Sequence, residues 1–164
     1  MTKKSIKEIA AVQPTPVELT IAQHGAWHTF LATHAVLVER INRRLIGEEL
    51  LPLEWYDVLL SLDKAPDQRL RMSELAAAVL LSRSGLTRLV DRLEAAGLLR
   101  REHCRTDRRG SFAVLTEAGT ASLRQTWPEY SRGIFEQFGS HLSDAEATQL
   151  TELLMRMLSA EVER

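Results

Sequence analysis

Three arginines stand close together in the segment 104–110, which also holds the chain's single cysteine. Arg105, Arg108 and Arg109 fall within five consecutive positions, on what is predicted to be the exposed tip of a β-hairpin. Such a cluster would repel itself unless an anion lay nearby. Asp107 stands two residues before Arg109 and can hold that guanidinium in one direction. An arginine presented in this way suits the narrow minor groove of double-stranded DNA.

A second polar group precedes the hairpin, on a predicted helix that is capped by Ser82 and runs to about residue 96. The apolar positions of this helix recur at steps of three and four, so that one side must be buried: Leu86, Leu89, Val90 and Leu93. The other side carries Ser84, Thr87, Arg88 and Asp91, with Arg83 near the start: a short, polar and partly basic face. Such a face suits base edges and phosphates in a major groove. For this helix alone, an ordinary amphipathic surface helix is an equal alternative.

These two groups belong to one predicted architecture. A short helix that we expect Ser73 to cap comes first, and the following helix stops at Gly97, a residue that tolerates the left-handed conformation. Two predicted strands, 98–103 and 111–115, then form the hairpin. Helix, turn, helix and basic hairpin together describe a winged helix-turn-helix, which we place at residues 51–116. The hairpin makes a merely solvated charged loop the weaker interpretation.

The residues of this region resemble the MarR family of bacterial transcription regulators. The fragments that carry the resemblance are Leu75-Ala76, Ser82-Arg83-Ser84, Thr87-Arg88-Leu89-Val90-Asp91-Arg92-Leu93-Glu94, Gly97-Leu98, Asp107-Arg108-Arg109 and Leu115-Thr116-Glu117-Ala118-Gly119. Each fragment is common, but their order and spacing are specific, and the resemblance covers about residues 27–164. It implies a dimeric, mainly helical DNA-binding regulator with a wing, often controlled by a small ligand or an oxidant. Two departures are visible: Leu80 stands where the turn often has glycine, and Cys104 where the wing usually has a polar residue or proline.

Long helices are predicted on both sides of the winged region, so the fold class is mainly α with a small β-wing. The first, at about 24–45, carries an apolar stripe of Trp27, Phe30, Leu31, His34, Val38, Ile41 and Leu45. A shorter helix opened by Pro52 follows, with Trp55, Val58, Leu59 and Leu62 facing inward. After the wing, Thr116 can cap a helix to about residue 139 whose buried face is Leu123, Trp127, Ile134 and Phe138. Pro128 lies inside it and should kink it or break it near Trp127.

The last predicted helix begins at a capping box, Ser143 to Glu146, and is strongly apolar to its end. It is too apolar and too terminal to be covered by so small a domain. We therefore expect a homodimer whose helical dimerisation region comprises 21–50 and 117–164, intertwined with the winged region in one domain. Residues 1–20, broken by Pro14 and Pro16, are expected to be a frayed tail, the alternative being a short helix packed on a partner subunit.

Composition sets limits on the class of protein. The 164 residues, 45% apolar and 26% charged, are those of one soluble domain. The net charge is only −1, but residues 83–110 hold eight arginines against four acids, a local charge of +4 that leaves −5 for the rest. One cysteine excludes an internal disulfide framework and favours a reducing cytoplasm. No apolar run approaches 18 residues, so we expect no membrane insertion. No catalytic constellation or phosphate-binding glycine loop stands out, so we expect no enzyme and no cofactor.

Two further groups could act as sensors. His24 and His28, four residues apart, would put two imidazoles on one helix face, as a zinc site needs, but three or four ligands make a full site and no adjacent set is evident. Capping or partial burial at the helix start is the alternative, and we predict no metal. Cys104, between His103 and Arg105, could be an oxidisable thiol or an incidental exposed one.

The resemblance also implies an effector cavity between the long first helix, the second helix and the winged region. Its candidate residues are Trp27, His28, Trp55, Asp57 and Arg92. Asp57 stands among apolar neighbours and needs a partner, for which a structural link to Arg92 is the first expectation. The alternative is an anionic aromatic ligand that displaces Asp57, pairs with an arginine and spreads the two DNA-reading heads by binding the spread state more tightly.

The functional prediction is therefore a dimeric, sequence-specific regulator, most simply a ligand-responsive repressor of a pseudo-palindromic operator. The expected DNA-binding residues are Ser82, Arg83, Ser84, Thr87, Arg88, Arg105, Asp107, Arg108 and Arg109. A zinc- or redox-responsive regulator is one alternative. A winged-helix module that binds proteins instead of DNA is another, but it would favour large apolar residues where Ser84, Thr87 and Arg88 stand.

Overall fold

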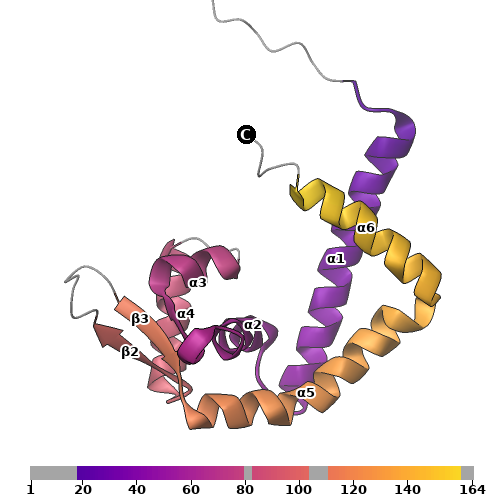
Figure 1. Cartoon of the computed structure of the whole chain (residues 1–164). Helices are drawn as coiled ribbons and strands as arrows, with labels where there is room; N and C mark the ends of the chain where they lie inside the picture. The colour runs from indigo at the N-terminus through magenta and orange to yellow at the C-terminus, as the bar shows by residue number, and fades with distance from the viewer. Residues whose placement is uncertain (1–17, 80–82, 104–110, 160–164) are drawn as a thin grey trace, which may run out of the picture. The chain divides into compact units, whose positions relative to one another are not determined.

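A computed structural model describes residues 18–79, 83–103 and 111–159 of the chain, and of residues 83, 84 and 103 it describes the backbone alone. The described elements are, in order, α1 (Ile21–Gly47), α2 (Leu53–Asp63), η1 (Pro66–Gln68), β1 (Arg69–Arg71), α3 (Met72–Ala78), α4 (Arg83–Ala95), β2 (Leu99–His103), β3 (Ser111–Leu115), α5 (Glu117–Gln137), η2 (Gly139–His141) and α6 (Asp144–Ser159) (Figure 1). The fold is mainly α with one small antiparallel sheet, as expected. Helix α1 begins in one compact unit, which ends at His34, and continues into a second, which begins at Ala35.

The core of the second unit lies between α2, α3, α4 and the sheet. Its fully buried side chains are aliphatic and come from all of these elements: Val58, Leu59, Leu62, Leu75, Leu86, Leu89, Val90, Leu93 and Leu99. The inward face predicted for the helix-turn-helix is thus confirmed, and so are three of the four inward positions of α2. The fourth, Trp55, is half-buried. Burying these side chains is the main source of stability for the region that carries the charged surface.

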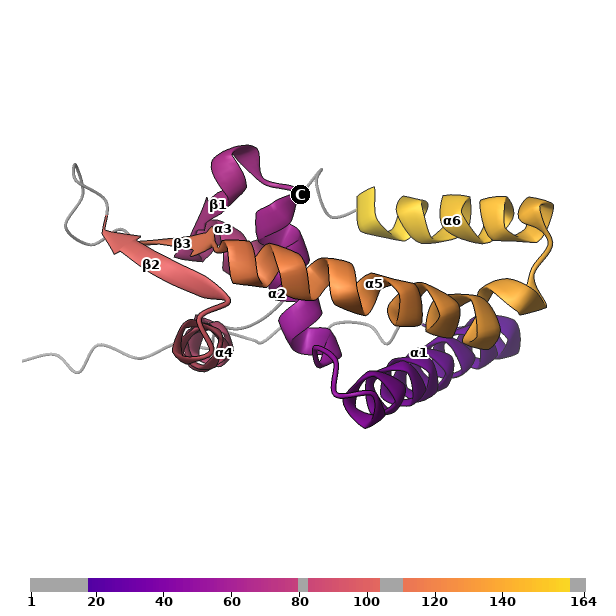
Figure 2. The same cartoon turned by 90° about the horizontal axis from the view of Figure 1, so that it is seen from below.

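The sheet has three strands, in the order β1-β3-β2, where the sequence predicted a two-stranded hairpin. Strand β1 pairs with β3 through Arg69 opposite Val114 and Arg71 opposite Phe112. Strands β2 and β3 pair from Leu99 opposite Leu115 onward, and β3 leads directly into α5 (Figure 2). A strand of three residues is too short to show an alternating pattern. It forms by pairing with a strand more than 40 positions along the chain, which the local sequence does not reveal.

The short strand also moves the start of α3. The helix begins at Met72 with Arg71 in the N-cap position, so the predicted cap at Ser73 is wrong. The backbone N–H of Arg71 donates to the carboxylate of Glu74, at 2.9 Å. Since Arg71 ends the strand in an extended conformation, the strand itself fixes where the helix can begin. The predicted cap of α4, Ser82, and the departure at Leu80 lie outside the described residues.

Helix α4 ends as the sequence predicts. Gly97 adopts φ +73°, the left-handed conformation that a side chain would disfavour, and the N–H of Leu98 donates to the carbonyl of Leu93 at 3.0 Å. This sharp reversal sends the chain from α4 straight into β2. The wing is therefore joined to α4 by a short, three-residue connection, residues 96–98.

Helix α5 is tied to the same reversal. The Thr116 hydroxyl accepts from the backbone N–H of Gly119 at 3.1 Å, the cap that was predicted, and donates to the carbonyl of Gly97 at 2.8 Å. The backbone of Gly119 packs on the Leu98 carbonyl so closely that a Cβ would lie 2.1 Å from its oxygen. The helix then runs without a break through Pro128 to Gln137. Of its predicted buried face, Leu123 is buried and Ile134 half-buried, whereas Trp127 and Phe138 are exposed.

Apolar side chains remain exposed on the outer helices of the single chain. In the first half of α1 they are Ile21, Trp27, Phe30 and Leu31. In α6 they are Leu153, Met155, Met157 and Leu158, the last two about two-thirds exposed at 67% and 68%. The predicted capping box of α6 is confirmed, since the Ser143 N–H donates to the Glu146 carboxylate at 2.9 Å and the Glu146 N–H donates back to the Ser143 hydroxyl at 3.4 Å. Two hydrogen bonds to its carboxylate, from the Ser143 backbone N–H foremost and from the Ser143 hydroxyl, lower the pKa of Glu146.

Candidate nucleic-acid interface

The outer face of α4 is the first part of the candidate interface. Thr87 and Arg88 are exposed, while Leu86 and Leu89 on the opposite side are almost completely buried, at 1% and 2% exposure. The helix is therefore held by its apolar side and presents short polar and basic groups to solvent. This is the arrangement needed for a helix that enters a major groove. Arg83 and Ser84 lie in the first turn of α4, and their side chains are outside the described residues.

An arginine clamp fixes the wing to α4. From β2, the Arg101 guanidinium donates to Asp91 and to Glu94, each at 2.6 Å. The backbone N–H of Arg101 also donates to Glu94, at 2.8 Å. Partial burial opposes the positive charge, yet hydrogen bonds to the two carboxylates raise the pKa of Arg101. The clamp sets the orientation of the hairpin relative to α4, and it engages Asp91, which the sequence had placed on the groove-facing side.

Sequence reasoning missed Arg101 as part of the site. The six positions from 100 to 105 contain three arginines, and only strand register separates their roles. Arg101 lies opposite Ala113 on the inner face of the sheet, whereas Arg100 lies opposite Val114 on the outer face, where it pairs with Glu102. Period-two alternation along 99–103 could have indicated this division, because the fully buried Leu99 fixes which positions face inward.

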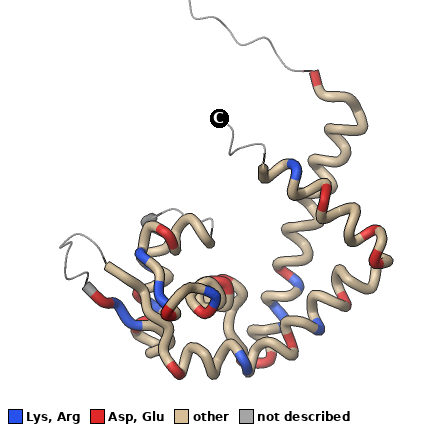
Figure 3. The backbone as a smooth tube through the Cα atoms, in the orientation of Figure 1, with Lys and Arg blue, Asp and Glu red and all other residues tan. Residues whose placement is uncertain are grey.

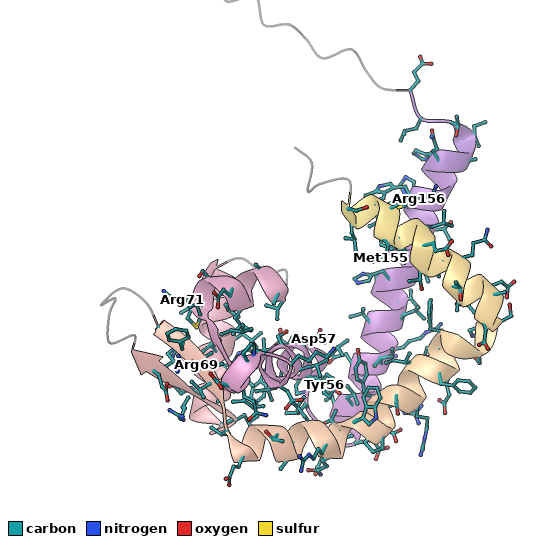
Figure 4. The ribbon with its side chains drawn as sticks, in the orientation of Figure 1. Tyr56, Asp57, Arg69, Arg71, Met155 and Arg156 are labelled. Carbon is teal, nitrogen blue, oxygen red and sulfur yellow. The ribbon has the colours of Figure 1, made fainter. Side chains whose placement is uncertain are left out.

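The outer face of the sheet carries a second basic group. Arg69 and Arg71, labelled in Figure 4, both stack over the Phe112 ring, with their guanidinium carbons 4.6 and 5.2 Å from its centroid. Arg69 also lies 3.8 Å from the Glu102 carboxylate. Stacking on an aromatic ring restrains the two guanidinium groups. Figure 3 shows basic and acidic positions close together over this part of the chain, so its positive charge is partly compensated.

The tip of the wing was predicted to carry the minor-groove contacts. Arg105, Asp107, Arg108 and Arg109 lie in 104–110, outside the described residues, as does Cys104. Strand β2 ends at His103, just before this segment, and strand β3 begins at Ser111, just after it.

The candidate effector residues are only partly brought together. Trp55 is half-buried and lines a cavity of about 180 Å³ with residues of the α1–α2 connection and of α5: Glu49, Leu50, Leu51, Pro52, Ser122, Gln125 and Thr126. The expected link between Arg92 and Asp57 is not formed. Arg92 pairs instead with Glu54, at 3.0 Å. Trp27 and His28 belong to the first unit, where both are exposed.

Asp57 instead lies near a pair of tyrosines. The rings of Tyr56 and Tyr130 meet edge to face, with centroids 4.7 Å apart. Burial raises the pKa of the Asp57 carboxyl even though its residue keeps contact with solvent. Burial, and to a lesser extent the charge of Asp57, also raises the pKa of Tyr130. This group on α2 and α5 joins the winged region to the helix that leaves it (Figure 4).

Clustered metal ligands and membrane-spanning helices are both absent from the part of the chain that the structure describes. Residues 18–79, 83–103 and 111–159 contain no group of three or more His, Cys, Asp or Glu side chains that could hold a metal ion. Among the same residues, no helix is both long and apolar enough to span a bilayer.

The geometry defines the class of protein: a winged helix-turn-helix whose exposed polar helix and basic hairpin are clamped together, as in DNA-binding regulators. The family model described as "MarR family" matches residues 51–110. The transcriptional repressor MprA of Escherichia coli strain K12 is 34% identical over 156 residues, covering 88% of each chain. The regulator MhqR of Bacillus subtilis is 34% identical over 119 residues, covering 73% of this chain and 79% of its own.

Solved structures agree. AbsC, a MarR family transcriptional regulator from Streptomyces coelicolor, superposes with a TM-score of 0.80 at 32% identity, covering 91% of this chain and all of its own. Sco3205, a MarR family regulator from the same species solved in complex with DNA, gives 0.79 at 33% identity, covering 88% and 90%. The chain belongs to the MarR family and is a DNA-binding transcriptional regulator.

Proposed function

We propose that two copies of this chain bind the two half-sites of a pseudo-palindromic operator and repress transcription from it. The observation that carries the proposal is the exposed pair Thr87 and Arg88 on a helix locked to the wing by Arg101. Ser84, Thr87 and Arg88 would read base edges in the major groove, with Ser82 capping the helix and Arg83 reading bases or holding phosphate. Arg109, oriented by Asp107, would enter the minor groove, with Arg105 and Arg108 on phosphates.

Dimerisation is supported by the exposed apolar side chains of the outer helices. Trp27 and Phe30 in α1, and Met157 and Leu158 in α6, would be costly to leave in water in a protein of this size. Pairing across a two-fold axis would cover them and would place two copies of α4 at a fixed spacing.

Control by an anionic aromatic effector is supported by the cavity beside Trp55 and by the charged groups of α2. The carboxylate of such a ligand would compete with Glu54 for Arg92, while its ring packed against Trp55. Trp27, His28 and Asp57 remain candidate contacts. The ligand would release DNA only to the extent that it bound the non-binding arrangement of the dimer more tightly.

The decisive experiment is fluorescence anisotropy with duplexes from the regulator's own upstream region, across a salt series. We expect Arg88→Ala to change sequence preference and Arg109→Ala to weaken binding to all sequences while lowering the salt slope by about one. Arg124→Ala removes an exposed arginine from α5 and is the matched control for charge. It should leave affinity and salt slope unchanged.

Two results of this experiment would contradict the proposal. Weak binding that is indifferent to sequence and to both Arg88 and Arg109 would contradict operator recognition and favour a protein partner. Unchanged affinity in Arg109→Ala would contradict the proposed contact between the wing and the minor groove.

A further inference from the structure

The first half of α1 carries a histidine pair that DNA binding does not use. His24 and His28 are one helical turn apart, both are exposed, and their imidazoles face each other. Their Nε2 atoms lie 3.2 Å apart and form a hydrogen bond, so in the neutral pair one Nε2 carries a proton and the other accepts it. The two rings approach each other through imidazole nitrogens, which are common metal ligands in proteins.

The separation of the two nitrogens matches the bite of a transition metal. A metal ion bound to two imidazoles lies about 2.05 Å from each nitrogen. With the nitrogens 3.2 Å apart, the N–metal–N angle is then about 103°, close to the tetrahedral value of about 109°. To bind a metal, both rings turn their Nε2 lone pairs toward it, and the ring whose Nε2 carries a proton moves that proton to Nδ1.

The pair also stands clear of the apolar stripe of α1. At about 100° per residue, the midpoint of His24 and His28 lies roughly 80° around the helix from the centre of the stripe made by Trp27, Phe30, Leu31, His34 and Val38. Covering the stripe in a dimer would therefore leave room for water or a further ligand at the two remaining coordination positions.

We propose that His24 and His28 form a chelating site for a divalent transition metal, with Zn²⁺ as the metal whose preferred geometry the pair fits. Imidazole nitrogens select zinc, copper and nickel over magnesium and calcium. With two protein ligands the site is open, so it exchanges its metal and is not a closed structural centre. The site is distinct from the residues that read DNA, and it does not depend on the proposed operator or effector.

The test is isothermal titration of the full chain with ZnCl₂, with MgCl₂ in parallel. We expect one Zn²⁺ per chain and no heat from Mg²⁺. His24→Gln and His28→Gln should each weaken zinc binding at least about tenfold, because each removes half of the chelate. His34→Gln is the matched control: His34 lies on the same helix, is exposed and stacks on Phe30 instead of on another histidine. It should bind zinc as the unchanged chain does.

A second measurement identifies the ligands directly. In ¹⁵N-labelled protein, zinc should shift the Nε2 resonances of His24 and His28 and leave those of His34 and His141 in place. Melting curves recorded in EDTA should coincide for all variants, which shows that the exposed substitutions leave the fold intact. Absence of zinc binding, or equal binding in the His24, His28 and His34 variants, would overturn the proposal.

Discussion

Neighbouring arginines in this regulator have different roles: one is exposed to solvent, and the next holds two structural elements together. Arg100 and Arg101 differ by one position in β2. The first forms an exposed ion pair with Glu102, and the second bridges β2 to two carboxylates of α4. Charge counting alone would treat them as equivalent, whereas strand alternation gives them opposite faces.

Replacing Arg101 should therefore cost stability that replacing Arg100 does not. Arg101→Ala leaves Asp91 and Glu94 without their shared partner, and we expect the free energy of unfolding to fall by about 1–2 kcal/mol. Arg100→Ala removes the same charge from the next position and should change stability by at most about 0.5 kcal/mol. Urea titrations of both variants measure the difference. Equal losses would mean that the clamp contributes no more than a surface ion pair.

Asp57 gives a prediction about pH. Its carboxyl has a pKa raised above the ordinary 3.8 by burial, so the folded state takes up its proton at a higher pH than the unfolded chain does. The resulting stabilisation is fully present below pH 3.8 and is lost as pH rises through the raised folded value. At neutral pH the burial disfavours folding, so Asp57→Asn should be more stable there than the unchanged chain, and this advantage should shrink as pH falls through that window. Thermal unfolding from pH 4 to pH 8 tests it, and an advantage independent of pH would contradict the assignment to the carboxylate.

At the scale of elements, the sequence predicts well whatever depends on local pattern. The buried face of α4, its end at Gly97 and the caps at Thr116 and Ser143 follow from periodicity and from residue type. Strand β1 and the N-cap at Arg71 do not, because they depend on pairing with a strand more than 40 residues away. The exposure of Trp127 is likewise invisible in a helical pattern, which shows that a residue belongs to an apolar face but not which surface covers it.

The junction between the wing and α5 is tightly packed at Gly119. Gly119→Ala would place a Cβ 2.1 Å from the Leu98 carbonyl oxygen and 2.7 Å from the Leu115 side chain, so the backbone of the junction must move. We expect a loss of about 1–3 kcal/mol in unfolding free energy. Gly25→Ala is the matched control, because nothing lies within 4 Å of its added Cβ and alanine favours a helix interior by about 1 kcal/mol. If chemical denaturation gave the two variants the same stability, close packing at Gly119 would not be the cause.

At the scale of the whole molecule, helix α5 connects the winged region, which carries the DNA-reading surface, to α6 with its exposed apolar side chains. The second half of α1 is anchored to α5 through Arg44, which pairs with Glu129 and Glu136, and these carboxylates raise its pKa. The winged region is anchored to the other end of α5 through Thr116 and Gly119. A change in how two copies pair can therefore reach α4 through one continuous helix.

This connection predicts that dimerisation and specific DNA binding are lost together. Leu158 is 68% exposed in the single chain, so Leu158→Glu places a charge where the proposed partner subunit would cover it, at little cost to the fold of one chain. We expect a monomer by sedimentation velocity, with affinity for a full operator reduced to that for a single half-site. Glu152→Gln alters an exposed polar position of the same helix and should remain dimeric. A Leu158→Glu protein that sedimented as a dimer and bound the full operator normally would show that the exposed end of α6 is not the surface through which two copies meet.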